Sequence, residues 1–160
     1  MLRLLKIVAA LFIGLIGLLF GLDNLFNTGA AYAVVSLIVS GAEQPYYAII
    51  GPTVNSGWLT WVALFTIVAG ELTTGLLGFA GAFRMIRARS ESADSFRNAK
   101  QLAILGGACG MLVWYGFFIV IGEAYFHMWQ SETGLGSVEG ALRYGTVCAV
   151  LMFFIASRDE

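Results

Sequence analysis

One stretch, Leu59–Arg89, constrains the fold of this chain more than any other. It holds about 25 mostly apolar residues with one carboxylate among them, and three arginines follow. About 20 apolar residues in a helix cross the ~30 Å hydrocarbon core of a bilayer, so this stretch is long enough to span a membrane. Glu71 lies near its midpoint. A charge at that depth costs at least ~2.5–3.5 kcal/mol, which makes Glu71 the first functional candidate.

Composition supports a membrane protein with one compact unit. Hydrophobic residues make up 59% of the 160 residues and charged residues 12%, about half the charged share of a soluble domain. Cys109 and Cys148 both lie in apolar segments. We therefore expect two free, buried thiols rather than a disulfide. Nothing in the charge balance indicates a nucleic-acid partner.

Hydropathy predicts an all-α, polytopic protein: an antiparallel bundle of four transmembrane helices within a single domain. The predicted spans lie at about 4–22, 59–83, 102–122 and 141–156. The first could instead be a signal peptide with a small-x-small site at Ala31–Ala33. Its apolar run is long for a signal, and that site lies well beyond it, so an uncleaved helix is the better interpretation.

The connections between spans differ in character. Segment 23–57 is predicted to cap the outer face, with a short interfacial helix near Tyr32–Val39. Segment 84–100 is a basic loop. Eight of the nine lysines and arginines lie at the N-terminus, in this loop or at the C-terminus, and Arg143 is the exception. The positive-inside rule therefore predicts that both termini are cytoplasmic.

Glu71 permits two interpretations. As a functional group, a carboxyl in a low-dielectric site can take up and release a proton or bind a cation. As a structural group, a protonated carboxyl would hold helices together by hydrogen bonds. We expect it to be mostly protonated near neutral pH and to face the third span, where Thr74, Trp114 and Tyr115 are the candidate partners.

Small residues at four-residue spacing predict close helix packing. The candidate packing glycines occur in three spans: Gly17 and Gly21, Gly70 and Gly78, Gly106 and Gly110. Glycine is also simply common in membrane helices, so this pattern alone does not assign partners.

Two further sets of residues lie at the outer face. Glu123 and Arg143 flank the third and fourth spans, and we expect an ion pair between them; binding of a lipid phosphate by Arg143 is the alternative. His127 and Trp129 form an aromatic and polar cluster after the third span. The single histidine disfavours haem or zinc, so we expect no metal and no cofactor. No catalytic residue set or phosphate loop is present, and we expect no enzymatic activity.

The run IGEAYFHMWQS at Ile121–Ser131 resembles the signature of a bacterial family of small integral membrane proteins, domain of unknown function 2165. The likeness covers nearly the whole chain and includes Met1–Ile7, Asp23–Asn24, Glu71 with Thr74, Gly81–Arg84, and Phe96 with Ala99–Lys100. Family members usually read GGEWFxMWQS, then a W-N-G turn and AFR. Gly134–Arg143 here reads GLGSVEGALR, so two tryptophans and an asparagine are missing. The resemblance implies four spans in a bacterial inner membrane and no established activity.

These patterns lead to three functional hypotheses. In the first, the protein acts through helix contacts in the lipid bilayer, as an accessory subunit of a larger membrane complex or by self-association. In the second, it is a small homodimeric transporter or proton-coupled carrier that uses Glu71. In the third, it is an outer-face ligand-binding protein built from the 23–57 cap, Trp129 and Arg143.

Overall fold

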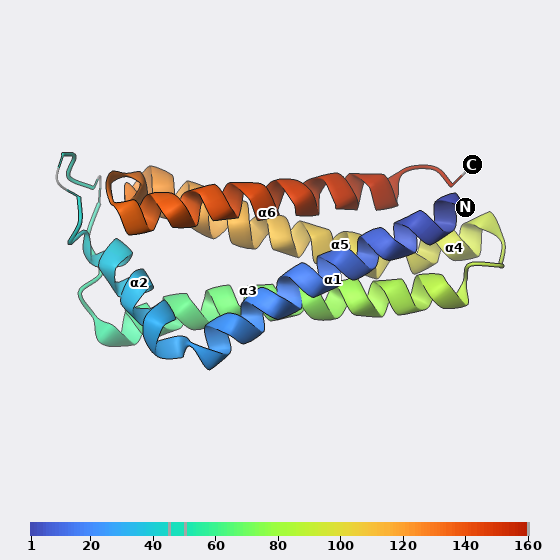
Figure 1. Cartoon of the computed structure of the whole chain (residues 1–160), viewed down its shortest axis with the longest axis horizontal. Coiled ribbons are helices and arrows are strands. Elements are labelled where there is room, and N and C mark those ends of the chain that lie inside the picture. The colour runs from blue at the N-terminus through green and yellow to red at the C-terminus, as the bar shows by residue number, and fades with distance from the viewer. Residues whose placement is uncertain (45, 50, 160) are drawn as a thin grey trace.

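Four long helices run along one axis and place both termini at the same end of the molecule (Figure 1). The computed structural model describes residues 1–44, 46–49 and 51–159. We call the end with the termini the terminus end and the opposite end the cap end. The elements are α1 (Leu2–Phe26), α2 (Thr28–Ser40), α3 (Gly57–Arg87), α4 (Ala93–Ala99), α5 (Gln101–Met111), η1 (Leu112–Tyr125), η2 (Met128–Gln130) and α6 (Glu132–Ala156).

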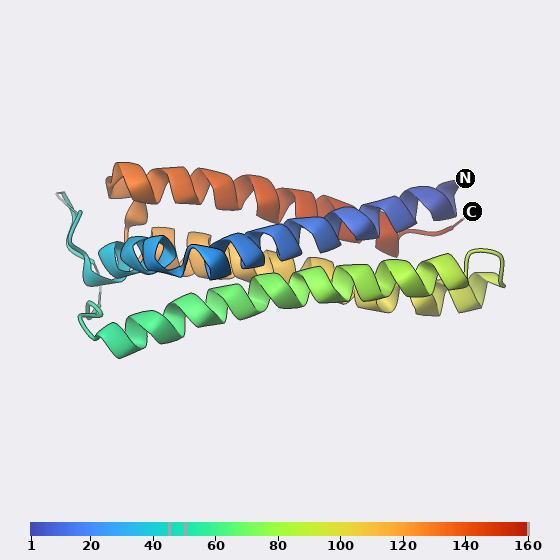
Figure 2. The same cartoon turned by 60° about the horizontal axis from the view of Figure 1, so that its bottom comes forward.

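The helical membrane architecture predicted from hydropathy is confirmed. Within the described residues, 4 helices are long and apolar enough to cross a bilayer: Leu2–Phe26, Gly57–Arg87, Ala93–Tyr125 and Glu132–Ala156. The third of these consists of α4, α5 and η1 in succession. In η1 the backbone follows the wider π-helical turn, and the amide of Phe126 donates to the carbonyl of Ile121 at 3.0 Å. Figure 2 shows the same four long helices in a second view.

Glycines set the distance between α1 and α3. A Cβ atom at Gly78 would lie 2.5 Å from the backbone nitrogen of Gly14, and one at Gly75 would lie 2.6 Å from that of Leu18. Side chains larger than hydrogen would force the two backbones apart at these positions. Gly78 also faces α5, where a Cβ at Gly106 would lie 2.9 Å from its nitrogen.

All four membrane helices are longer than the predicted spans, and the extensions of α6 and α1 at the cap end bear on the candidate site. α6 begins at Glu132 rather than near residue 141, because Ser131 caps its first turn by accepting a hydrogen bond from the amide of Gly134 at 3.0 Å. α1 continues to Phe26 rather than ending near residue 22. Asp23 and Asn24 therefore lie within the last turn of α1 rather than in a loop.

The cap consists of α2 and the segment that follows it. The short helix expected in this connection is α2, which ends at Gly41 in the left-handed conformation that glycine favours (φ 72°). Gln130 fastens the next segment: its Oε1 accepts from the amides of Tyr46 and Tyr47 at 2.9 and 2.8 Å. In Figure 1, α2 crosses the bundle at the cap end.

Candidate functional site

The carboxyl group of Glu71 is bound by α1. Asn24 Nδ2 donates a hydrogen bond to Glu71 Oε2 at 2.8 Å, and only 1% of Glu71 is exposed. The contact follows from the way in which facing glycines align α1 with α3. Gly17 of α1 faces Gly75 of antiparallel α3, so residues further along α1 lie beside residues that precede Gly75. Asn24, in the last turn of α1, is thereby placed within reach of Glu71.

Glu71 and Asn24 line a cavity of about 540 Å³ between α1, α2, α3, η1 and α6. The cavity forms because α3, which begins at Gly57, extends further toward the cap end than α1, which ends at Phe26. Asp23, Asn27 and Gly136 also line the cavity and are exposed, so it is reached from outside between α1, α2 and α6. We call it the Glu71 cavity.

Four aromatic residues line the cavity, and the rings of Phe20, Trp114 and Tyr144 lie close together. The ring of Phe20 lies 4.4 Å from that of Tyr144 and 6.0 Å from that of Trp114, measured between centroids. All three residues line the Glu71 cavity. Aromatic faces attract cations, and a buried carboxyl is stable in ionised form only beside a positive charge. The arrangement can hold a proton on Glu71 or a small cation beside it.

The partners predicted for Glu71 lie in different places. Trp114 lines the cavity with Glu71. Thr74 Oγ1 donates to the carbonyl of Gly70 at 2.9 Å, and Tyr115 shares a 2.8 Å hydrogen bond with Thr146. Adjacent residues of a helix point in different directions, so Trp114 and Tyr115 do not face the same neighbour. The hydrogen-bond partner in the structure is Asn24, which the prediction missed because it ended α1 too early.

The predicted ion pair between Glu123 and Arg143 is wrong. Arg143 Nη2 lies 3.5 Å from Glu139 Oε2, one turn earlier in the same helix, and both side chains are exposed. The reason is the early start of α6, which places Arg143 well inside the helix and gives it a carboxylate four residues away. Glu123, in η1, is half-buried.

His127 precedes the short η2 turn at the cap end, and Trp129 lies within that turn. Their ring centroids lie 6.3 Å apart, and Trp129 lies 5.9 Å from Tyr47 of the cap. His127 has φ 51°, which is unusual for a residue with a Cβ. Across the described part of the chain, no group of three or more His, Cys, Asp and Glu side chains could hold a metal ion.

The predicted packing glycines lie at helix contacts. A Cβ at Gly17 would meet the backbone of Gly75, and one at Gly21 would lie 2.7 Å from Leu72 of α3. A Cβ at Gly70 would lie 2.5 Å from Cγ2 of Val113 in η1. Gly110 is surrounded by the side chains of Cys148, Trp114 and Thr74. Gly78 and Gly106 face each other between α3 and α5.

A charged cluster at the terminus end was not predicted. Lys6 Nζ lies 2.7 Å from Asp159 Oδ1, and Lys100 Nζ lies 3.0 Å from Asp159 Oδ2. Both lysines also donate to the carbonyl of Ser157, at 2.6 and 2.9 Å. Burial alone would raise the pKa of Asp159, but the hydrogen bonds from the two ammonium groups outweigh it and hold that pKa below its usual value. We call this set the C-terminal lock.

Comparison with known proteins supports the membrane architecture. The sequence is 28% identical over 135 residues to the ammonium transporter Amt2 of Methanocaldococcus jannaschii. The match covers 82% of this chain and 31% of the transporter. The chain thus corresponds to about a third of that relative. No solved structure matches the chain. The family model described as predicted small integral membrane protein (DUF2165) matches residues 2–158. Because that match includes nearly every residue, the chain belongs to the DUF2165 family of small integral membrane proteins.

Proposed function

We propose that this small integral membrane protein is a carrier that binds a cation of the ammonium class at Glu71. The observation that carries the proposal is the buried Glu71 carboxyl, which Asn24 orients at the wall of a cavity lined by four aromatic residues. An ionisable group buried within a membrane span is costly and marks a ligand or ion path by default. An ammonium ion would pair with the carboxylate and contact the ring faces.

The similarity to an ammonium transporter supports the choice of ligand class. It extends over 82% of this chain but over 31% of the transporter. The carboxyl and the aromatic rings provide the chemical argument, and the transporter supplies a reason to test ammonium compounds before other cations.

In this proposal the terminus end faces the cytoplasm of a bacterial cell, and the protein lies in the inner membrane. The support is the charge distribution: eight of nine lysines and arginines lie in segments that the fold brings to the terminus end. The Glu71 cavity then opens toward the outer side. When the cavity is empty, a proton neutralises Glu71. Cation binding therefore releases that proton, and this exchange couples the movement of the cation to that of the proton.

Uptake into proteoliposomes tests the proposal. We expect radiolabelled methylammonium to accumulate in vesicles that contain the protein and not in empty vesicles. Glu71→Gln removes the charge with little change of shape and should abolish uptake. Glu43→Gln is the matched control, because Glu43 is an exposed carboxylate of the cap, and it should leave uptake unchanged. Equal uptake by the protein and its Glu71→Gln variant would overturn the proposal.

A second candidate is an accessory subunit of a larger membrane complex. It is supported by the packing between the Glu71 cavity and the terminus end, where Gly14, Gly17, Gly75 and Gly78 bring α1 and α3 into backbone contact. Because the bundle is closed on the side away from the ligand site, this arrangement suits a subunit that holds a ligand without transporting it. Extraction of native membranes in mild detergent, followed by mass spectrometry, tests this candidate. Stoichiometric recovery of other membrane proteins supports it, whereas a homodimer alone contradicts it.

A further inference from the structure

We infer that the ligand of the Glu71 cavity is an amphiphilic ammonium compound, whose hydrocarbon tail occupies a second, apolar cavity beside it. The inference rests on the proposed function, because it assumes a cation at Glu71. It adds the substrate class: an amine with an alkyl tail rather than the bare ammonium ion.

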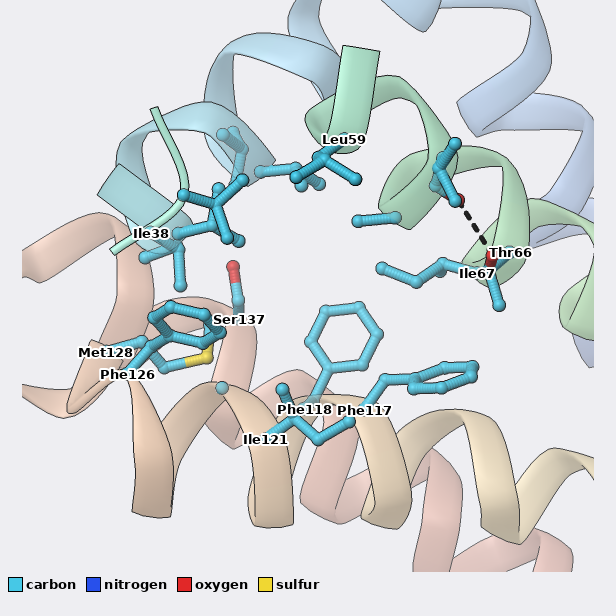
Figure 3. Close-up of a pocket in the computed structure, with 17 residues that line it drawn as sticks. Ile38, Leu59, Thr66, Ile67, Phe117, Phe118, Ile121, Phe126, Met128 and Ser137 are labelled. Carbon is cyan, nitrogen blue, oxygen red and sulfur yellow. Dashed lines mark hydrogen bonds between the residues drawn. The ribbon is translucent and has the colours of Figure 1, made fainter. Parts of the chain in front are cut away.

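The second cavity lies between α2, α3, η1 and α6 and has a volume of about 370 Å³. We call it the apolar cavity. Figure 3 shows labelled side chains around it, among them Ile38 of α2, Leu59 of α3 and Phe118 of η1. Its lining is almost entirely hydrocarbon, aromatic ring and thioether, and includes Ile38, Leu59, Phe117, Ile121, Phe126 and Met128. Such a surface favours an alkyl chain over water.

The two hydroxyl groups in the lining do not require a polar ligand. Thr66 Oγ1 donates to the carbonyl of Val62 at 2.7 Å, which Figure 3 marks with a dashed line. Ser137 Oγ donates to the carbonyl of Thr133 at 3.0 Å. Because each hydroxyl hydrogen is already bound within its own helix, an apolar ligand leaves neither donor unsatisfied.

The two cavities adjoin each other. Five residues line both of them: Val34, Val35, Ile67, Phe118 and Ser137. In this inference a single molecule passes between the shared side chains, with one end beside Glu71, the other in the apolar cavity, and Ile67 and Phe118 against its middle. The polar end offers a carboxyl and the amide of Asn24, and the far end offers only apolar contacts.

Charge selects among amphiphiles. Glu71 and Asp23 both place carboxyl groups in the lining of the Glu71 cavity, and among the described residues that lining includes no lysine, arginine or histidine. A fatty acid or the phosphate of a lipid would place a negative charge beside them, whereas a simple alkylammonium places a positive charge there. The chemistry therefore favours an amine head over an anionic one.

Calorimetric titration of the protein in nanodiscs tests this inference, with empty nanodiscs subtracted. The probes are methyl-, butyl- and hexylammonium, and the neutral alcohols butanol and hexanol. Burial of one methylene is worth about 0.8 kcal/mol, so affinity should rise about fourfold for each carbon added to the amine tail. The alcohols should bind far more weakly than amines of equal length.

Two matched variants locate the tail. Ala63 lines the apolar cavity and not the Glu71 cavity, so Ala63→Phe should fill the space and remove the gain from longer tails. It should leave methylammonium binding unchanged. Ala80→Phe is the control, because Ala80 is exposed on the same helix. If Ala63→Phe does not fold, the smaller Ala63→Leu takes its place.

The outcomes separate this inference from the proposed function. If methylammonium binds through Glu71 but longer tails bring no gain, or the gain persists when Ala63 is enlarged, the tail site is refuted and the cation site stands. If no amine binds, or Glu71→Gln binds amines equally well, the proposed function fails and the inference falls with it. If the affinity of the alcohols rises with chain length as that of the amines does, and alcohols bind as tightly as amines of equal length, then the apolar cavity binds ligands without Glu71. The inference of an amphiphilic ammonium ligand is then refuted.

Discussion

Lys6 and Asp159 are joined by a 2.7 Å ion pair that ties the start of α1 to the segment after α6. Their side chains are almost fully buried, at 0% and 8% exposed. Lys6 also donates to the carbonyls of Ser157 and Arg158, so its ammonium group satisfies the acceptors that follow the last helix. The C-terminal lock is therefore a buried network in which one carboxylate serves Lys6 and Lys100.

Replacing Asp159 by Asn should destabilise the protein by about 3 kcal/mol, because it leaves two buried ammonium groups without their carboxylate. The measurement is thermal or denaturant unfolding in detergent. Asp94→Asn is the control: Asp94 pairs with Arg97 at the surface, where both side chains are largely exposed. Removal of that pair should cost less than about 1 kcal/mol. Equal effects of the two substitutions would contradict the structural role of the lock.

The lock also predicts a dependence of stability on pH. The folded pKa of Asp159 lies below its ordinary value of 3.8, so the folded state favours the ionised carboxylate. Its contribution is therefore complete above that value and is lost as the pH falls through the folded pKa. The difference in stability between the protein and Asp159→Asn should be constant near neutral pH and shrink in acid. A difference that grows on acidification would have the wrong sign.

The spans could be predicted from the sequence because hydropathy and charge are local properties. Runs such as Leu59–Phe83 are long enough to cross a bilayer whatever they contact. The helix ends were less predictable. Asp23 and Asn24 look like a helix terminus, yet α1 continues to Phe26 and uses them to form the candidate site. Ser131 looks like part of a loop motif, but it caps α6.

The partner of Glu71 could not be predicted from depth alone. The expectation that Glu71 faces the third span pointed to Trp114 and Tyr115, but the register of α1 against α3 depends on which glycines meet. Gly17 faces Gly75, and this pairing brings Asn24 to Glu71. The C-terminal lock was missed for a similar reason: Lys6, Lys100 and Asp159 are far apart in sequence, and only the fold brings them together.

Close packing of α1 on α3 is tested by Gly17→Ala. The added Cβ would meet the backbone nitrogen of Gly75 and lie 2.6 Å from the carbonyl oxygen of Glu71, and neither atom can rotate away. We expect a loss of about 1–3 kcal/mol in unfolding free energy. Gly29→Ala is the control, because apart from its own stretch of helix no atom of the described residues lies within 4 Å of its Cβ position. Alanine favours helix there by up to about 1 kcal/mol, so the control should be neutral or stabilising.

His127 offers a test of backbone conformation. Its φ of 51° is left-handed, and its buried Nδ1 has no hydrogen-bond partner among the residues that the structure describes. Asn tolerates this conformation well, whereas a β-branched residue does not. Both His127→Asn and His127→Val remove the imidazole ring, so their comparison isolates the backbone. We expect the Asn variant to be more stable than the Val variant by about 1–2 kcal/mol in unfolding experiments. Equal stabilities would contradict the assigned conformation.

The bond from Asn24 to Glu71 can be tested without knowledge of the ligand. Asn24→Leu removes the 2.8 Å donor and should shift the infrared carboxyl band of Glu71, which a difference spectrum against Glu71→Gln identifies. It should also lower stability by about 1–3 kcal/mol, because the buried carboxyl loses a partner. Asn98→Leu is the control, since Asn98 is exposed on α4, and it should leave the band unchanged. An identical Glu71 band in the protein and in Asn24→Leu would show that Asn24 does not bind the carboxyl. The cation site would then depend on the aromatic rings and Glu71 alone.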